Sequence, residues 1–253
     1  MSPVIDALRQ SQDRFAAVLR PLSDSSVRDR SYDDEWSIAD VASHLGSQAE
    51  IFGLYLAAGL DGSEPPARDA FPPIWDRWNA KDPADQVSDS IAANEELVTR
   101  LEGVTGADRD AFTVDMFGGT RDLDGLSAMR LGEHAVHTWD IAVALDPSAT
   151  VDPVAVRQLL DAVPGTAANI GKAVAGADPV IIATTDPARA YRVTLDPEVS
   201  LHALDGVAAP DLTMPAEALL RLVYGRLDPA HTPSSVTGDM ARLADLRKAF
   251  PGF

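Results

Sequence analysis

The sequence places a carboxylate and an imidazole four residues apart, at Glu133 and His137, inside a long helical pattern. Residues four apart lie on one face of a helix, so both side chains can reach a common point in space. The pattern around them is apolar on most sides, and burying a carboxylate is costly unless another group pairs with it. A metal ion would meet that need if the chain supplies a third ligand.

His44 is the candidate third ligand. It stands at the edge of an apolar stripe formed by Ile38, Val41, Leu45 and Phe52 at helical spacing, so it can point into a core. Two histidines and one carboxylate are a ligand set of catalytic zinc sites, which leave a fourth position open for water or substrate. The same set also suits non-haem Fe(II). Taken alone, a Glu/His pair at this spacing is a weak signal, because such pairs are common on helix surfaces.

Three further side chains near these motifs have other predicted roles. His134 points about 100° away from its neighbour around the helix, which favours a packing or supporting role. Asp140, three residues after His137, could accept the other ring N–H and thereby fix the tautomer of that histidine. Asp40 could do the same for His44, but with Ser37 it forms a capping-box pattern, which is the favoured interpretation.

Arginine side chains could hold an anionic ligand, because a guanidinium binds a carboxylate through two parallel hydrogen bonds. Arg130 lies three residues before Glu133 and is a candidate for the same pocket. Arg77 stands between two tryptophans, and Arg226 follows a glycine that ends a helical pattern. From the residues alone, an ordinary ion pair is the favoured interpretation of each.

The elements that must position the first site are long helices. Apolar periodicity and start signals predict four of them, joined in one place by a Pro- and Trp-bearing connection from Glu64 to Trp78. Helix bundles build metal sites from polar side chains on facing inner surfaces, so these helices predict a bundle with an internal site. The predicted helices cover about residues 3–20, 37–60, 83–101 and 126–145.

The pattern changes after Pro147. A helix is predicted from Asp152 to near Pro164, followed by short alternating runs that indicate strands of a mainly antiparallel sheet. The chain is therefore predicted to be α+β, with a helical domain over residues 1–148 and a small α/β domain over residues 149–253. The later elements are strands at 180–185, 191–195, 199–203, 211–214 and around Val236, and helices at 215–224 and 239–250.

Composition limits the functions open to the chain. It has 21 basic and 39 acidic side chains and a formal charge of −18, which makes nucleic acid and anionic membranes poor partners. The absence of cysteine excludes disulfides, thiolate zinc ligands and a thiol nucleophile of its own. No secretory signal is visible, and the most apolar run, residues 51–60, is far shorter than the roughly 20 residues of a membrane span. We expect a cytoplasmic protein.

Two stretches, Trp36–Leu45 and Gly132–Asp140, resemble the mycothiol-dependent maleylpyruvate isomerase family of actinobacteria. The N-terminal domain of that family is a DinB-like four-helix bundle. Tyr224–Leu227 followed by Val236–Asp239 resembles the family's C-terminal domain, which is related to sterol-carrier-like α/β folds. The resemblance extends over almost the whole chain.

This resemblance implies that His44, Glu133 and His137 bind a divalent metal, usually zinc. It also implies that Arg226 contributes to catalysis and to binding mycothiol, the low-molecular-weight thiol that members use as cofactor or co-substrate. Arg130 is a second candidate for cofactor binding because of its position near Glu133.

The resulting hypothesis is a zinc-dependent enzyme in which a metal-bound thiolate attacks an electrophilic small molecule. The outcome would be maleylpyruvate-type cis–trans isomerisation or transfer of the thiol sulfur, and a chain without cysteine fits an enzyme that borrows its nucleophile. Two alternatives stay open: a hydrolase of the DinB superfamily that uses metal-activated water, and a non-catalytic small-molecule-binding protein. The chain is expected to be a monomer or a small homo-oligomer.

Overall fold

The fold comes from a computed structural model that describes residues 2–33 and 35–252. Its contacts divide the chain into two compact units, the first ending at Val151 and the second beginning at Asp152. Long helices dominate the first unit, and the second contains a five-stranded sheet. The predicted α+β class is therefore confirmed.

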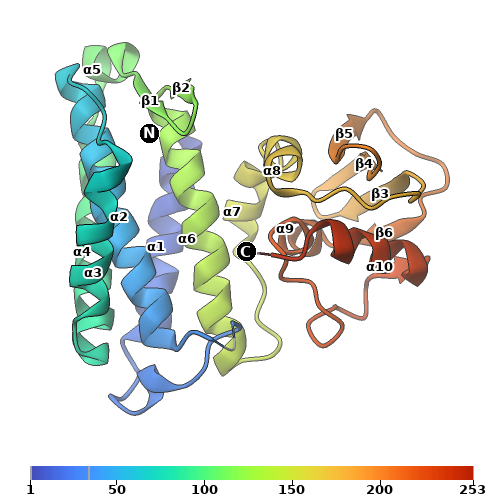
Figure 1. The fold of residues 1–253 in the computed structure, drawn as a ribbon, viewed down its shortest axis with the longest axis horizontal. Helices are drawn as coiled ribbons and strands as arrows, with labels where there is room; N and C mark the ends of the chain where they lie inside the picture. Colours follow the sequence, from blue (N-terminus) through green and yellow to red (C-terminus); the bar gives the residue numbers. More distant parts are fainter. Residues whose placement is uncertain (1, 34, 253) are drawn as a thin grey trace. The chain divides into compact units, whose positions relative to one another are not determined.

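Four long helices form the first unit and run side by side in Figure 1. Helix α1 packs against α4 and α6, and α2 also packs against α4 and α6. Each of the four helices therefore contacts two others around one core. All four were predicted from apolar periodicity, to within a few residues at each end. Their bounds are α1 (Pro3–Leu19), α2 (Ile38–Asp61), α4 (Pro83–Gly103) and α6 (Leu123–Leu145).

Both ends of α2 are fixed by local chemistry. The Ser37 hydroxyl accepts a hydrogen bond from the Asp40 backbone N–H, and the Asp40 carboxylate accepts one from the Ser37 backbone N–H. This reciprocal pair is the predicted capping box, and it satisfies two backbone donors that the helix itself cannot. The helix ends at Gly62, whose φ of 65° lies in the left-handed region that glycine adopts without a steric penalty.

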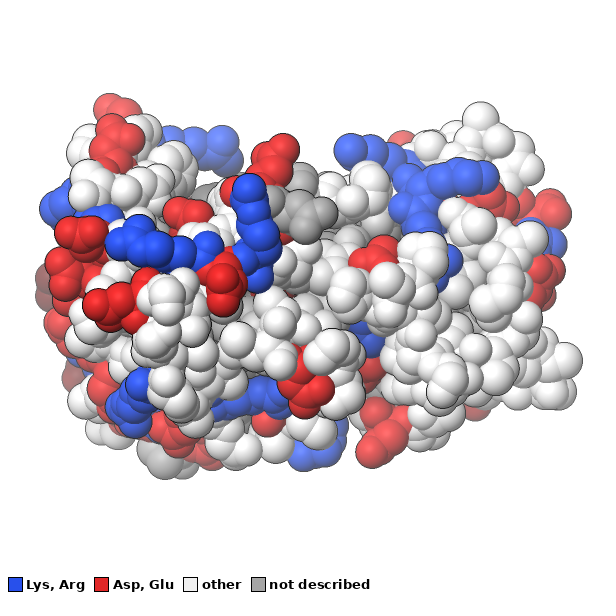
Figure 2. All heavy atoms as spheres, turned by 90° about the horizontal axis from the view of Figure 1, so that it is seen from below, with Lys and Arg blue, Asp and Glu red and all other residues white. Residues whose placement is uncertain are grey.

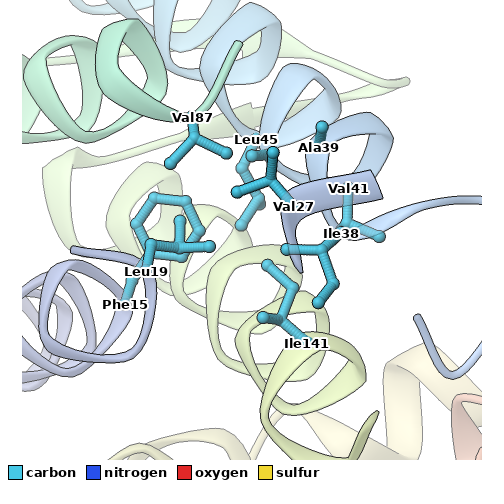
Figure 3. Close-up of a cluster of buried hydrophobic side chains, with 10 residues drawn as sticks. Phe15, Leu19, Val27, Ile38, Ala39, Val41, Leu45, Val87 and Ile141 are labelled. Atoms are coloured by element: carbon cyan, nitrogen blue, oxygen red, sulfur yellow. The ribbon is translucent and has the colours of Figure 1, made fainter. Parts of the chain in front are cut away.

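A cluster of buried apolar side chains joins the four helices beside this start of α2, and Figure 3 shows them pointing toward one another. Ile38, Val41 and Leu45 are among them, which confirms the predicted apolar stripe of α2. Such a core holds the helices at fixed separations, because protein interiors are packed as densely as organic crystals. The cluster consists of Phe15, Leu19, Val27, Ile38, Ala39, Val41, Ala42, Leu45, Val87 and Ile141.

The segment from Glu64 to Trp78 was predicted as a connection, and the prediction missed two helical elements within it. It contains a 3₁₀ turn, η2 (Arg68–Ala70), and a helix, α3 (Phe71–Asn79). Two prolines follow Phe71 in the first turn of α3, where the N–H that proline lacks would have no helical partner. Phe71, Ile74 and Trp78 are buried at helical spacing. The prolines therefore begin a helix here.

Trp78 packs directly on α2 at Gly46. A Cβ atom at Gly46 would lie 2.2 Å from the Trp78 ring, which is closer than any real contact. Glycine at this position therefore lets α2 and α3 approach each other.

Shorter elements of the first unit were not predicted. They are η1 (Ser26–Arg28), α5 (Gly106–Ala111) and a hairpin of β1 (Val114–Met116) and β2 (Gly119–Arg121). The two turn residues, Phe117 and Gly118, both have positive φ values, of 47° and 82°, as tight hairpins require. Phenylalanine is an unusual residue in that conformation, so the turn has no ordinary sequence signal.

The second unit begins with two short helices, α7 (Pro153–Leu159) and α8 (Val163–Ile170). Asp152 caps α7 as expected, accepting hydrogen bonds from the backbone N–H groups of Val154 and Ala155. The sequence predicted one helix ending near Pro164, but Pro164 lies in the first turn of α8. Proline is compatible with either role, which explains the error.

The sheet of the second unit has the strand order β5–β4–β3–β6–β7. All pairs are antiparallel except β3 with β6, which confirms the expectation of a mainly antiparallel sheet. Helices α8, α9 (Ala216–Val223) and α10 (Met240–Ala249) pack against it. The last strand begins at Thr237, one residue after the predicted Val236. The strands are β3 (Val180–Thr185), β4 (Ala188–Thr194), β5 (Ser200–Leu204), β6 (Leu212–Met214) and β7 (Thr237–Gly238).

Charged side chains of both signs occur on the surface. On the face that Figure 2 shows, basic side chains lie among acidic ones. Such neighbours include the ion pairs between Arg9 and Glu95 and between Lys81 and Asp89, each 2.7 Å long. Within the described ranges, every helix is too short or too polar to cross a membrane.

Candidate metal centre

Helices α2 and α6 bring the predicted ligands together. His44 comes from α2, and Glu133 and His137 lie one turn apart on α6. One ligand atom from each of the three residues lies within 4.8 Å of the others. Glu133 Oε2 is 3.6 Å from His44 Nε2 and 3.8 Å from His137 Nε2.

These separations suit a single metal ion. Bonds of about 2.1 Å at tetrahedral angles would place the ligand atoms roughly 3.4 Å apart. The two separations from Glu133 are within a few tenths of an ångström of that value. Two imidazole nitrogens and a carboxylate oxygen are also ligand types that zinc accepts. The side chains of His44, Glu133 and His137 are 25%, 33% and 15% exposed, so solvent reaches all three.

The electrostatics keep His44 and Glu133 in the protonation states that metal binding requires. Burial lowers the pKa of His44 and so favours its neutral form. Burial alone would raise the pKa of Glu133, but its contact with His44, the charge of His137 and a hydrogen bond from Gln48 together lower it to about 2. An ionised carboxylate beside a neutral imidazole is a metal-binding arrangement.

Asp140 holds His137 in place. Its Oδ2 lies 2.9 Å from His137 Nδ1, and its side chain is only 2% exposed. A carboxylate only accepts hydrogen bonds, so His137 Nδ1 carries a proton, and in the neutral ring the lone pair is then on Nε2, on the side of Glu133. This is the role predicted for Asp140. Asp40 instead caps α2, the role that the sequence favoured for it.

Comparison with known families decides where the chain belongs. A family model described as the mycothiol maleylpyruvate isomerase N-terminal domain matches residues 8–142, which is more than half of the chain and includes all three candidate ligands. The chain belongs to this family. Among curated protein sequences, none matches the chain.

Solved structures share the fold of this family member. A crystal structure of the mycothiol-dependent maleylpyruvate isomerase matches with a TM-score of 0.65 and 15% identity, covering 94% of this chain and 92% of that one. A mutant of that isomerase, with one histidine replaced by alanine, matches with a TM-score of 0.63 and 15% identity. That match covers 89% of this chain and 90% of the other. The shared fold therefore includes both units.

Two residues beside the candidate ligands of this family member were not predicted as part of the site. The Trp36 ring lies 5.3 Å from the His44 ring and stacks on the His137 ring at 6.4 Å, between centroids. The Gln48 amide nitrogen contacts both His44 and Glu133. Gln48 follows His44 by four residues on α2, so helical spacing alone could have identified it.

Arg130 lies beside the site but inside the bundle. Its side chain is 1% exposed and extends into the bundle, where it donates hydrogen bonds to Leu45 O, Asn94 Oδ1 and Gln48 Oε1. Burial lowers the pKa of Arg130 to about 10, which leaves it charged at neutral pH. Its two terminal nitrogens donate to these protein oxygens, whereas its buried Nε has no hydrogen-bond partner among the described residues. Its contact with the site passes through Gln48.

Arg226 belongs to the loop that follows α9 in the second unit. It is buried there, and its guanidinium donates to the backbone carbonyl of Tyr224 at 2.7 Å. Arg221 donates to the Arg226 carbonyl and pairs with Glu217 at 2.7 Å, which fixes the backbone on both sides of Arg226. Gly225, with a φ of 75°, makes the turn.

The other singled-out residues have structural partners. Arg77 forms an ion pair with Glu50, which confirms its interpretation as a surface pair. His134 is fully buried, and its Nδ1 forms a 2.8 Å hydrogen bond with the Ser11 hydroxyl. Burial and the charge of Arg130 lower the pKa of His134 well below its usual value, as suits a packing histidine.

Proposed function

We propose that this chain is a zinc-dependent enzyme that uses mycothiol to act on an electrophilic small molecule of the maleylpyruvate type. The convergence of His44, Glu133 and His137 on one point carries the proposal. Membership of a family named for this isomerase supports it. Another divalent metal could replace zinc, because the same ligand set suits several ions.

When bound, the ion would lower the pKa of a thiol from about 8.5 and so supply thiolate at neutral pH. The residues of this chain would hold the ion and shape the site around it. His44, Glu133 and His137 would hold the ion, and Asp140 would keep His137 in the tautomer that leaves Nε2 free to bind. Trp36 would provide an aromatic wall next to both histidines. The chain has no cysteine, so the thiol has to arrive on another molecule.

Two outcomes of the thiolate attack are open. In an isomerase, a C–S bond forms at the cis double bond while its π electrons move toward the neighbouring carbonyl. Rotation follows, and the same electrons restore the double bond as the thiolate leaves, so the thiol is recovered. In an S-transferase, the conjugate takes up a proton and is released with the sulfur attached.

Metal content and thiol dependence together test the proposal. We expect the purified protein to bind about one zinc ion per chain, and to convert maleylpyruvate-type substrates only when mycothiol is added. Mass spectrometry of the products distinguishes an isomer with recovered thiol from a conjugate. Equal turnover without thiol would favour a hydrolase that activates water. A protein that binds neither zinc nor other divalent metals would favour a non-catalytic binding role.

Arg226 is proposed to act in catalysis and in binding the anionic thiol or substrate. We expect Arg226→Ala to reduce kcat/KM by about 10–150-fold, the effect of losing a charge-assisted hydrogen bond worth about 1.5–3 kcal/mol, with zinc content unchanged. Arg192, which is exposed on β4, gives a matched control in Arg192→Ala. Loss of zinc from Arg226→Ala, or activity equal to that of the control, would contradict this role.

A further inference from the structure

Gln48 connects the candidate ligands to the interior of the bundle. Its amide nitrogen lies 2.8 Å from Glu133 Oε2 and 2.9 Å from His44 Nε2. Its amide oxygen accepts a hydrogen bond from Arg130 Nη1 at 3.2 Å. One side chain of α2 thus contacts two candidate ligands on one side and a buried cation on the other.

The chemistry of these partners fixes which way the amide points. Arginine can only donate hydrogen bonds, so the atom that faces Arg130 is the oxygen of Gln48. A carboxylate can only accept them, so the atom that faces Glu133 is the nitrogen. The two ends require the same orientation, and a reversed amide would lose both hydrogen bonds.

Arg130 is itself held rigidly. Besides Gln48, it donates to the carbonyl of Leu45 at 3.0 Å and to the side-chain oxygen of Asn94 on α4. The Asn94 amide donates in turn to the backbone carbonyls of Ser90 and Leu45. The bonds between Arg130, Asn94 and these backbone carbonyls are buried, so breaking one would leave a polar atom unsatisfied, which costs about 1–3 kcal/mol.

Glu133 needs such support. Its side chain has three rotatable bonds and is one-third exposed, so the carboxylate could turn to water and away from the histidines. Direct hydrogen bonds to ligating carboxylates are known to matter, and removing them typically weakens metal binding 10–100-fold.

We propose that Gln48 is a positioning residue of the metal centre: Arg130 holds its carbonyl, and its amide N–H holds Glu133 Oε2 toward His44 and His137. This inference rests on the proposed function, since it assumes that the three residues bind a metal. A metal ion bound to His44 Nε2 would occupy the lone pair that the Gln48 amide now contacts. The amide would then donate its hydrogen bond to Glu133 alone.

Zinc affinity, measured by competition with a chromogenic chelator, tests this role. We expect Gln48→Leu to weaken zinc binding about tenfold, at the lower end of the usual range because two of the three ligands are unaffected. Gln86 is a buried glutamine on α4 that contacts the backbone of Trp78 and Asn79, so Gln86→Leu is the matched control and should bind zinc within about twofold of wild type. The visible spectrum of the Co²⁺ forms should change in Gln48→Leu and stay the same in the control.

A double-mutant cycle tests whether Arg130 acts through Gln48. If it does, Arg130→Lys should weaken zinc binding in the wild-type background and have little further effect in Gln48→Leu. Lysine keeps a buried positive charge but lacks the planar guanidinium that binds several acceptors at once. We therefore expect the bundle of the lysine variant to fold. Additive losses would show that Arg130 supports the site independently and would overturn that step.

The outcomes separate this inference from the proposed function. If wild-type protein binds no metal, both fail. If wild type binds zinc and Gln48→Leu binds it within about twofold as tightly, Gln48 has no positioning role, although the proposed function stands.

Discussion

Replacing His44 by alanine is expected to weaken zinc binding by about a hundredfold or more and to abolish thiol-dependent turnover, while the bundle stays folded. Four-ligand zinc sites bind with apparent free energies of about 10–16 kcal/mol, so one ligand contributes roughly 3 kcal/mol, or about two factors of ten in affinity. His44 is partly exposed at the edge of the core, and alanine favours a helix. Chelator competition measures zinc affinity, circular dichroism measures folding, and an assay with added thiol measures turnover.

His202 provides the control for this variant. It is exposed on β5 in the second unit, so His202→Ala removes an imidazole without touching the candidate centre. The control should retain zinc affinity and turnover. If His44→Ala retained one tightly bound zinc ion per chain, His44 would not be a ligand, and the two-histidine, one-carboxylate assignment would be lost with it.

The long helices and the candidate ligand set could be predicted because both depend on short-range periodicity. Glu133 and His137 share a face at any helix position, and the capping box of Ser37 and Asp40 marks the start of α2 locally. What periodicity could not establish is that α2 and α6 would be neighbours with His44 turned toward that face. That required the family resemblance at the sequence level and the packing of the bundle in the structure.

Part of the surroundings of the site could not be predicted, because it depends on which partners the long side chains reach in the folded chain. Arg130 is close to Glu133 along the helix, which predicted that both line the same pocket. Its long side chain instead extends into the bundle and reaches Asn94 on α4. Helical spacing could place Gln48 next to His44, but its hydrogen bond with Arg130 is known only from the structure. Likewise, α3 depends on Trp78 fitting against Gly46, a contact between elements that the sequence does not specify.

Asp140→Asn is expected to weaken zinc binding about 10–100-fold, the second-largest effect after loss of a ligand. The ionised carboxylate accepts the His137 Nδ1–H and so keeps the Nε2 lone pair directed at the site. Asparagine is uncharged and therefore a weaker acceptor. If its NH₂ group faces the ring instead, Nδ1 becomes the acceptor and the proton moves to Nε2, where it blocks metal binding. Chelator competition measures the loss, and ¹⁵N NMR of the imidazole distinguishes the two tautomers.

Asp40→Asn is the matched control, since it makes the same change on the other helix that carries a ligand. Asp40 is exposed and its carboxylate binds the backbone of Ser37, so this variant should lose at most about 1 kcal/mol of stability and no zinc affinity. The pair of variants separates a carboxylate that orients a ligand from one that caps a helix. Equal zinc affinities in the two variants would mean that His137 keeps its tautomer without Asp140, and that the buried carboxylate only stabilises the fold.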